Sequence, residues 1–425
     1  MAWAPPWGDG RVGSRMNLEL QGIVDTMAAR VGRPALIEDG RHRVVVYSEH
    51  TGTMDDVRRS SILRRHTTPE VISWFRGFGI MKARSPVRIP ACPELDLLPR
   101  LCVPIVHQDR LLGYVWFIEA DSGMTEADID VVTRATGDLS LALYRESLLG
   151  ELASQREAEA ARTLLSESAV TREEMVRSLL ADGVVTADGP ATAIVAQLVP
   201  ARGRMLDGDA GMALEQALVA TRRWVGVRDA LHLLRHDQGV LLVRGGQAGG
   251  RPSAETAAGY LRESLRNAVG AAREAARVVV GIGAVRPRLA EAIHSYDEAV
   301  QAARVGVRLP ALGPLITWAD LGIYRMLSQM DGRHLDVATV HPGLHRLLGD
   351  EANQALLETL EAYLDLAGNA HATAEQLRLH RTTLYYRLHR VEQLAETDLK
   401  DGNERLCLHL GLKLARLSGD YRPST

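Results

Sequence analysis

The sequence is poor in cysteine, in aromatic residues and in long apolar runs. Its three cysteines, Cys92, Cys102 and Cys407, form no Cys-x-x-Cys pair, which argues against a disulfide framework and against a zinc ribbon. Such sparse cysteine use is typical of a reducing compartment, so we expect a cytoplasmic protein. No apolar run approaches the roughly 18 residues of a membrane-spanning helix, so we expect no membrane partner.

The chain also lacks a large net charge. Its 50 basic and 53 acidic residues leave a formal charge of −3, and 46% of the residues are hydrophobic. This balance excludes wholesale disorder and a uniformly basic nucleic-acid coat. Any nucleic-acid site must therefore be a local basic patch. The length of 425 residues predicts about three domains.

Common catalytic and cofactor motifs are absent as well. The sequence contains no P-loop, no His-Glu-x-x-His and no Gly-x-Ser-x-Gly. Gly281-Ile282-Gly283 follows a predicted strand, but Arg286 stands where a dinucleotide fingerprint needs its third glycine, so we interpret the segment as a turn at a strand end. We expect no catalytic residue and no cofactor.

One pair of histidines has the spacing of metal ligands. His341 and His345 are four residues apart, which would place both imidazoles on one face of a helix. Pro342-Gly343 lies between them and argues against a helix there. We expect histidines in a loop and no metal site.

The N-terminal third predicts a small antiparallel sheet packed by helices. A helix is expected over 17–31, strands over 35–38, 43–47, 101–106 and 111–118, helical or irregular stretches over 53–78, and a further helix from Thr125. This order suits a GAF-like or PAS-like sensor domain. Residues 17–145 are therefore predicted to be a sensor or dimerisation domain, with an unknown small-molecule effector as a possible ligand.

The segment from 138 to 181 is helical in character almost throughout. A discontinuous apolar stripe runs through it, formed by Leu141, Leu148 and Leu152 and then by Leu164, Leu165, Met175 and Leu179. We predict one or two connecting helices, with a helical linker over 146–182. A short parallel coiled coil that joins two copies and a solvated linker with one packed face both remain open.

The middle of the chain predicts a second α/β unit. Strands are expected over 191–199, 231–235, 240–243, 277–282 and 315–318, with helices over 210–224, 254–269 and 287–305. Alternation of strands and helices around a central hairpin suggests a ferredoxin-like or cyclase-like sheet over 183–320. After Leu321 no strand pattern remains, and 351–366 predicts a helix.

The segment from Asn369 to Leu394 predicts a helix-turn-helix. Gly368 is suited to end one helix and Asn369 to cap the next. A short helix over 370–377, a turn over 378–380 and a second helix over 381–394 have the lengths of a DNA-binding pair.

The second of these helices is expected to have two different faces. Leu384, Leu388 and Val391 recur at the spacing of a buried stripe, and Thr382, Tyr386, His389 and Arg390 fall opposite. Four arginines, two histidines and two threonines lie between 378 and 390, with no acid among them. Arginine can grip guanine or phosphate bidentately, and hydroxyl groups can contact phosphates and base edges. This favours DNA binding over an ordinary basic helix in a bundle.

A resemblance to a known family rests on these residues. Gly368-Asn369, Thr373-Ala374, Leu377 and the run from His380 to Leu388 closely resemble the C-terminal helix-turn-helix of the PucR/CdaR family of bacterial transcription regulators. The match continues through Asp398-Leu399 and Arg405-Leu406 to the leucine-rich helix 408–417, while Thr382 stands where the family usually has Asn. The predicted DNA-binding residues are Thr373, Arg378, His380, Arg381, Thr382, Thr383, Tyr385, Tyr386, Arg387, His389 and Arg390.

The rest of the chain is similar to the usual layout of that family. Residues 191–318 resemble its GGDEF-like central domain, and 17–145 resemble a GAF-type sensor. A diguanylate cyclase carries an acidic signature on its central hairpin. Here the turn from Arg235 to Gly239 contains a single acidic residue, Asp237. One carboxylate cannot hold the two Mg²⁺ ions and position GTP, so we expect a degenerate domain without enzymatic activity.

These observations predict a multidomain α+β protein. It comprises a GAF-like sensor (17–145), a helical linker (146–182), a degenerate ferredoxin/GGDEF-like domain (183–320) and an all-α helix-turn-helix domain (345–425). We expect a cytoplasmic, one-component transcription regulator that binds double-stranded DNA as a homodimer and reads the major groove with helix 381–394. The alternatives are a nucleotide cyclase or phosphodiesterase built on the central domain, and a scaffold whose basic helix holds an acidic partner instead of DNA.

Overall fold

The computed structural model describes residues 12–40, 42–50, 52–120, 122–200, 208–235, 237–245, 252–269, 277–330 and 336–423. The chain divides into two compact units, Met1–Ser154 and Gln155–Thr425. His236, in the expected central hairpin turn, lies outside the described residues. None of the described helices combines the length and the apolar character that spanning a bilayer requires.

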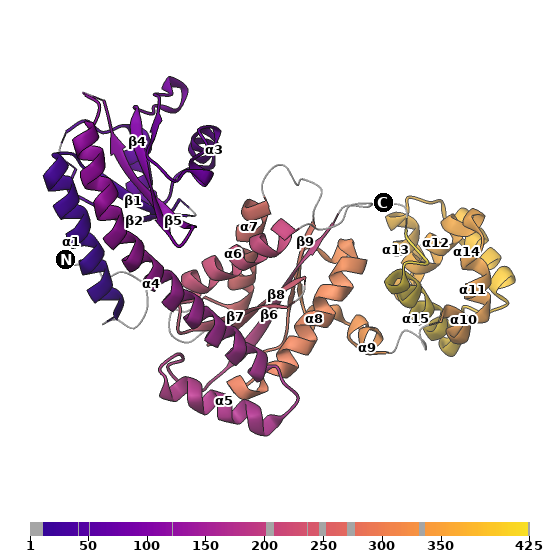
Figure 1. The fold of residues 1–425 in the computed structure, drawn as a ribbon. Coiled ribbons are helices and arrows are strands. Elements are labelled where there is room, and N and C mark those ends of the chain that lie inside the picture. The colour runs from indigo at the N-terminus through magenta and orange to yellow at the C-terminus, as the bar shows by residue number, and fades with distance from the viewer. Residues whose placement is uncertain are drawn as a thin grey trace. The chain divides into compact units, whose positions relative to one another are not determined.

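The N-terminal unit is built on a five-stranded sheet (Figure 1). The strands lie in the order β2-β1-β5-β4-β3, and every neighbouring pair is antiparallel. The elements are α1 (Val12–Val31), β1 (Ala35–Asp39), β2 (Val44–Tyr47), α2 (Asp56–Arg64), α3 (Pro69–Gly77), β3 (Val87–Ile89), β4 (Arg100–His107), β5 (Arg110–Ile118) and the first part of α4 (Glu126–Leu164).

Alternation along the strands separates two apolar clusters on the two faces of this sheet. Ile37 and Phe117 face the cluster that α1 and α4 complete. Their neighbours Leu36 and Trp116 face the other cluster, which is covered by α2 and α3. This arrangement has the expected order of helix, strand pair, helical insert, strand pair and helix. The sequence does not predict β3, because three residues at a sheet edge are too few to show a period of two.

The hairpin between β4 and β5 is tighter than the four residues that separate the predicted strands 101–106 and 111–118. The strands run on to His107 and start again at Arg110, so only Gln108 and Asp109 form the turn. Both residues have positive φ, 46° and 63°, as the favoured two-residue hairpin turn requires.

The central domain opens the second unit. Its elements are the end of α4, α5 (Ala169–Ala181), β6 (Ala191–Val199), α6 (Gly208–Val225), β7 (Ala230–Arg235), β8 (Gln238–Arg244), α7 (Ala254–Val269), β9 (Arg277–Ile282), α8 (Ala292–Arg308), β10 (Leu315–Thr317) and α9 (Tyr324–Gln329). The sheet order is β10-β9-β6-β8-β7. Strands β6 to β9 form the antiparallel ferredoxin-like arrangement, and β10 adds to β9 in parallel. The predicted ferredoxin-like sheet is confirmed.

Helices cover both faces of the central sheet (Figure 1). Helices α6 and α7 enclose one apolar cluster, which includes Leu218 and Leu261. The other face packs against α8, and Leu164 of α4 and Leu179 of α5 join its cluster. The second half of the expected linker thus belongs to the core of the central domain.

Two glycines set the close approach of α8 to β9. A Cβ atom at Gly281 would overlap the carbonyl oxygen of Ala299, and one at Gly283 would overlap that of Ser295. Gly281 lies within β9, so the Gly281-Ile282-Gly283 segment is not simply a turn after the strand. Its glycines serve helix-to-sheet packing.

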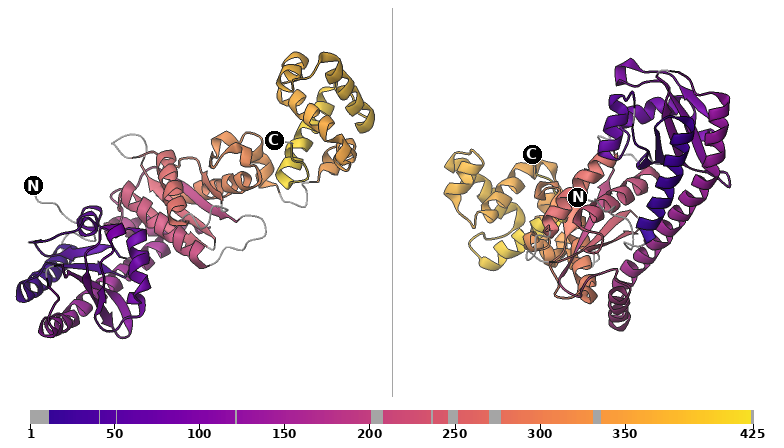
Figure 2. Two further views of the ribbon diagram at one scale, coloured as in Figure 1. Left: turned by 90° about the horizontal axis from the view of Figure 1, so that it is seen from above. Right: turned by 90° about the vertical axis from the view of Figure 1, so that its left-hand side faces the viewer.

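The C-terminal region contains no strand among its described residues, as expected (Figure 2). Its helices are α10 (Val337–Val340), α11 (Pro342–Leu348), α12 (Gln354–Asp365), α13 (Ala370–Gln376), α14 (Arg381–Ala395) and α15 (Gly402–Ser418).

The expectation that Pro342-Gly343 prevents a helix is wrong. Pro342 occupies the first turn of α11, where its missing N–H has no partner to lose, and His341 caps the helix by accepting from Leu344 N at 2.9 Å. Gly343 is needed because a Cβ there would overlap the carbonyl oxygen of Ala395. His341 Nε2 lies 3.1 Å from Glu404 Oε2. The described residues contain no cluster of three or more His, Cys, Asp or Glu suited to a metal ion.

The glycine packing makes a testable prediction. Gly281→Ala should lower the free energy of unfolding by about 1–3 kcal/mol, because the new methyl group forces α8 away from the sheet. The matched control is Gly259→Ala in α7, where a Cβ meets nothing within 4 Å. That change should raise the free energy of unfolding by roughly 0.5–1 kcal/mol through helix propensity. Urea unfolding of both variants checks the pair, and equal effects would contradict the packing argument.

Candidate nucleic-acid interface

Helices α12, α13 and α14 have their ends defined by local sequence. After α12, Ala367 and Gly368 adopt positive φ, and Gly368 N donates to Tyr363 O at 2.8 Å, which closes the helix end. Asn369 then caps α13 by accepting from Ala372 N at 3.1 Å. The predicted short helix, tight turn and second helix are confirmed, with α13 and α14 in contact.

The apolar stripe of α14 holds it against the bundle. Leu384 and Val391 are fully buried and Leu388 is 6% exposed. They join one cluster with leucines of α11, α12 and α15. Because one face of α14 is fixed in this way, the opposite face must point to solvent.

That opposite face carries the predicted polar residues. Tyr386 is 70% and Tyr385 48% exposed. Arg378, His380, Arg381, Thr382, Thr383, His389 and Arg390 are also exposed. The structure therefore brings nine of the eleven predicted residues to the surface of the turn and of α14. Gln376, which is not among the predicted residues, is also exposed, two residues before Arg378.

Contacts within this surface orient several side chains. The guanidinium of Arg381 lies 5.6 Å from the ring centre of Tyr385, in cation–π geometry. His380 Nδ1 lies 2.8 Å from Thr382 Oγ1 at the start of α14. The first acidic residue of α14 is Glu392, whose carboxylate accepts a hydrogen bond from Leu399 N at 3.1 Å. The exposed surface from Arg378 to Arg390 is consequently basic.

Two predicted residues are placed differently. Thr373 is completely buried, and its hydroxyl donates to Asn369 O at 2.7 Å, so it supports α13 and is not available to a ligand. Arg387 is half-buried, and its Nη1 donates to Thr359 Oγ1 at 3.1 Å and Ala355 O at 3.4 Å. It ties α14 to α12. Spacing alone could not reveal these partners, because they lie on another helix or in the backbone.

Comparison with known proteins agrees with this geometry. Residues 356–414 match the PucR C-terminal helix-turn-helix domain, and residues 171–305 match a GGDEF-like domain. The DNA-binding transcriptional activator AdeR of Bacillus subtilis is 22% identical over 405 residues, which cover 94% of this chain and 93% of AdeR. The proline-responsive transcriptional activator PutR of the same organism is 22% identical over 405 residues, covering 93% of this chain and 96% of PutR.

A shorter match concerns the C-terminal domain. The purine catabolism regulatory protein of Bacillus subtilis is 39% identical over 67 residues, which make up 16% of this chain and 13% of that protein. A helix-turn-helix with an exposed basic second helix, in a chain similar from end to end to transcription activators, defines a DNA-binding transcription regulator. The match of residues 356–414 to the PucR C-terminal helix-turn-helix domain confirms the predicted resemblance of this part of the chain.

The turn before α14 makes a second prediction. Arg378 has a φ of 52°, a left-handed conformation that costs a residue with a side chain about 1–2 kcal/mol. Arg378→Gly should raise the free energy of unfolding by about 1 kcal/mol, because glycine adopts this backbone conformation without strain. The same change should weaken DNA binding, because it removes a cation. Glu396→Gly is the matched control, since Glu396 has a φ of 56° at the far end of α14. It should stabilise the protein equally without loss of DNA affinity. Thermal unfolding and fluorescence anisotropy with DNA measure the two effects.

Proposed function

We propose that α14 enters the major groove of double-stranded DNA. The observation that carries this proposal is the exposed face from Arg378 to Arg390, which is basic and free of acids on a protein of net charge −3. Arginine side chains on such a helix can grip guanine edges or phosphates, and hydroxyl groups can contact both. The proposed contacts are Arg378, His380, Arg381, Thr382, Thr383, Tyr385, Tyr386, His389 and Arg390. Arg387 acts by holding the helix in place.

We propose further that the protein is a homodimer joined through α4. Leu141, Leu148 and Leu152 are 43–44% exposed and follow one another at intervals of seven and four residues, the spacing of a coiled-coil seam. Between Tyr144 and Glu157, no described residue of α4 belongs to an apolar cluster of its own chain. A second copy would cover these leucines, and a parallel pair would bring two recognition helices to one DNA duplex.

We propose that the N-terminal unit is a GAF-like sensor. Its antiparallel sheet has helices α2 and α3 inserted between β2 and β3, over one face. Sensing and DNA binding would then reside in one cytoplasmic chain, which makes the protein a one-component regulator. The relative PutR is named as proline-responsive, which supports a small-molecule effector as the signal.

We propose that the central domain relays this signal and catalyses no reaction. Among the described residues of the β7–β8 turn, Asp237 is the only acid, and its Oδ2 lies 3.4 Å from Gln197 Nε2. A single carboxylate is too little to hold two catalytic Mg²⁺ ions. Turnover of GTP or ATP with Mg²⁺ by the purified protein would support the cyclase alternative instead.

The DNA proposal is tested with the full chain. Selection of bound genomic fragments should enrich a defined operator. Arg381→Ala should then weaken operator binding by about 1–3 kcal/mol if Arg381 grips a guanine. The control is Arg266→Ala in α7, an exposed arginine on the central domain, which should leave affinity unchanged. Four phosphate contacts per subunit predict a log–log salt slope of about −3.6 per subunit.

Other outcomes of this experiment would contradict the proposal that α14 binds DNA. A salt-independent affinity would contradict the electrostatic argument. Retention of no fragment at low salt, together with retention of an acidic protein, would favour a scaffold over a regulator.

The dimer proposal is tested separately. The double variant Leu148→Glu, Leu152→Glu should convert the dimer into monomers, because it places four carboxylates in the seam of the pair. Leu63→Glu is the matched control, since Leu63 is 77% exposed on α2 and lies outside the seam. Sedimentation equilibrium measures the mass of each variant. A dimer that survives the double change must use another surface.

A further inference from the structure

The last turn of α15 packs outside its own domain. Leu408, Leu412 and Ala415 of this helix belong to the apolar cluster that also holds α14, whereas Leu417 does not. Both domains lie in the compact unit Gln155–Thr425. Leu417 packs against a cluster of the central domain, formed by residues of β9, α8, β10 and the turns after α8 and β10: Val279, Ala302, Val305, Leu309, Ile316 and Leu321.

Polar contacts accompany Leu417. Arg308, the last residue of α8, donates from Nη1 to Ser418 O at 3.2 Å. Tyr324 of α9 packs against the same cluster as Leu417. Burial raises the pKa of Tyr324 to about 12, and Arg416 of α15 and Glu361 of α12 are near enough to influence it. Two helices of the central domain, α8 and α9, therefore meet the end of α15.

Helix α15 is in turn tied to the rest of the C-terminal domain. Glu361 of α12 is 6% exposed and pairs with Arg416 Nη1 at 2.9 Å and with Lys413 Nζ at 3.4 Å. The cluster that buries α15 also buries Leu384 and Val391 of α14. Because a close-packed core moves as a body, a shift of α15 must carry α14 with it.

The contact has the character of a reversible interface. Leu417 and Tyr324 are only half-buried, and Arg308 is exposed. Domains of one chain move relative to each other unless their interface is large and apolar. The basic face of α14 stays exposed while α15 is docked, so this contact does not cover the DNA-binding surface. It fixes the direction in which that surface points.

We infer that docking of α15 on the central domain is a reversible regulatory contact that sets the direction of α14. In a homodimer, two docked domains would be held at the spacing of two half-sites, whereas undocked domains would lose this preorganisation. A change in the central domain that displaces Leu417 would then lower operator affinity without altering α14. This inference rests on the proposed dimer and on the proposed major-groove contact.

The test compares two leucine variants of the full-length protein. Leu417→Gln should undock α15 and leave the C-terminal domain folded, because Leu417 is not part of its cluster. Leu406→Gln is the matched control, since Leu406 is 66% exposed on the same helix. Fluorescence anisotropy measures binding to the selected operator with two half-sites and to a duplex with one.

The two DNA duplexes separate undocking from damage to the fold. Leu417→Gln should bind the operator about tenfold more weakly and the single half-site as the native protein does, since only the coupling between half-sites is lost. A damaged helix-turn-helix would lose affinity for both duplexes. Leu406→Gln should match the native protein on both.

A milder pair of variants tests the same contact at the surface. Arg308→Gln removes the hydrogen bond to Ser418 O and should weaken operator binding in the same direction as Leu417→Gln, by a smaller factor. Arg304→Gln is its control, because Arg304 is exposed one turn earlier on α8, and it should leave operator binding unchanged.

A fluorine signal reports docking without DNA. Trp318 packs against the cluster that receives Leu417. In fluorotryptophan-labelled protein, Leu417→Gln should shift the Trp318 signal and leave that of Trp224 on α6 unchanged. Leu406→Gln should shift neither signal. An unshifted Trp318 signal in Leu417→Gln, or equal operator affinity of the two leucine variants, would overturn the inference.

Failure of the proposed function gives different results. Native protein that binds the operator no more tightly than one half-site refutes the dimer, and with it the effect of docking on half-site spacing. Native protein that retains no DNA refutes the major-groove contact. In both cases the Trp318 signal still decides whether α15 docks on the central domain.

Discussion

Burial of the apolar stripe of α14 is the interaction on which the exposed basic surface of the C-terminal domain depends. Leu384, Leu388 and Val391 bury one side of the helix in the C-terminal core, so the opposite side faces solvent. Arg387 reinforces this orientation by reaching back to α12. The basic surface is therefore a consequence of apolar packing, which fixes both the rotation of the helix and the residues that a ligand meets.

Periodic apolar patterns allowed most of the fold to be predicted from the sequence. The ferredoxin-like sheet follows from strands such as 191–199 and 277–282, and the helix-turn-helix follows from capping residues and a two-sided helix. Both signals are local, because each depends on residues within a few turns or one strand. The same reasoning identified nine residues that lie exposed on the turn and on α14.

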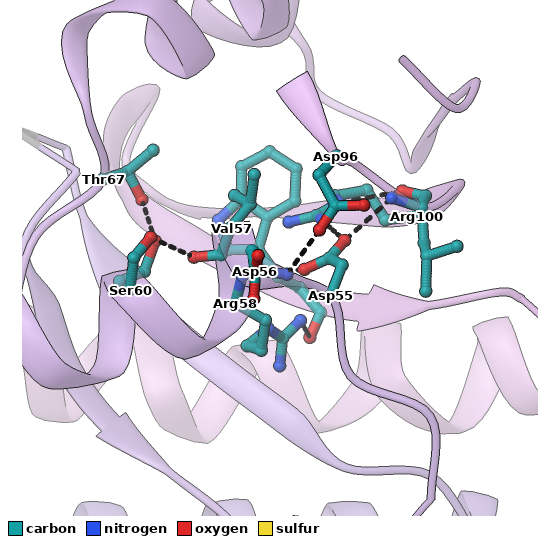
Figure 3. A network of polar contacts seen from close by, with 11 residues as sticks. Asp55, Asp56, Val57, Arg58, Ser60, Thr67, Asp96 and Arg100 are labelled. Atoms are coloured by element: carbon teal, nitrogen blue, oxygen red, sulfur yellow. Dashed lines mark hydrogen bonds and ion pairs between the residues drawn. The ribbon is translucent and has the colours of Figure 1, made fainter. Parts of the chain in front are cut away.

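What could not be predicted depends on partners distant in sequence. The sequence suggests a surface hydroxyl at Thr373, but this residue lies on the buried side of α13. It suggests a helix breaker at Gly343, but the end of α14 packs against this glycine. The charged interior behind α2 combines Glu38, Asp55 and Arg100, which are separated by tens of residues. Figure 3 shows the ion pair of Asp55 and Arg100. No period or spacing predicts such a group, because tertiary packing alone assembles it.

The exceptions to local rules also carry the functional argument. A folded domain can satisfy a buried arginine within its own chain, as Arg172 does with three backbone carbonyl groups. Arg58 is more deeply buried, at 1% exposed against 8% for Arg172, and one arm of its guanidinium has no acceptor among the described residues. An internal water is the usual partner of such a buried donor in a folded domain. Arg378 is an exception of another kind, because its left-handed backbone at an exposed turn costs stability and places a cation on the basic surface of the turn and of α14.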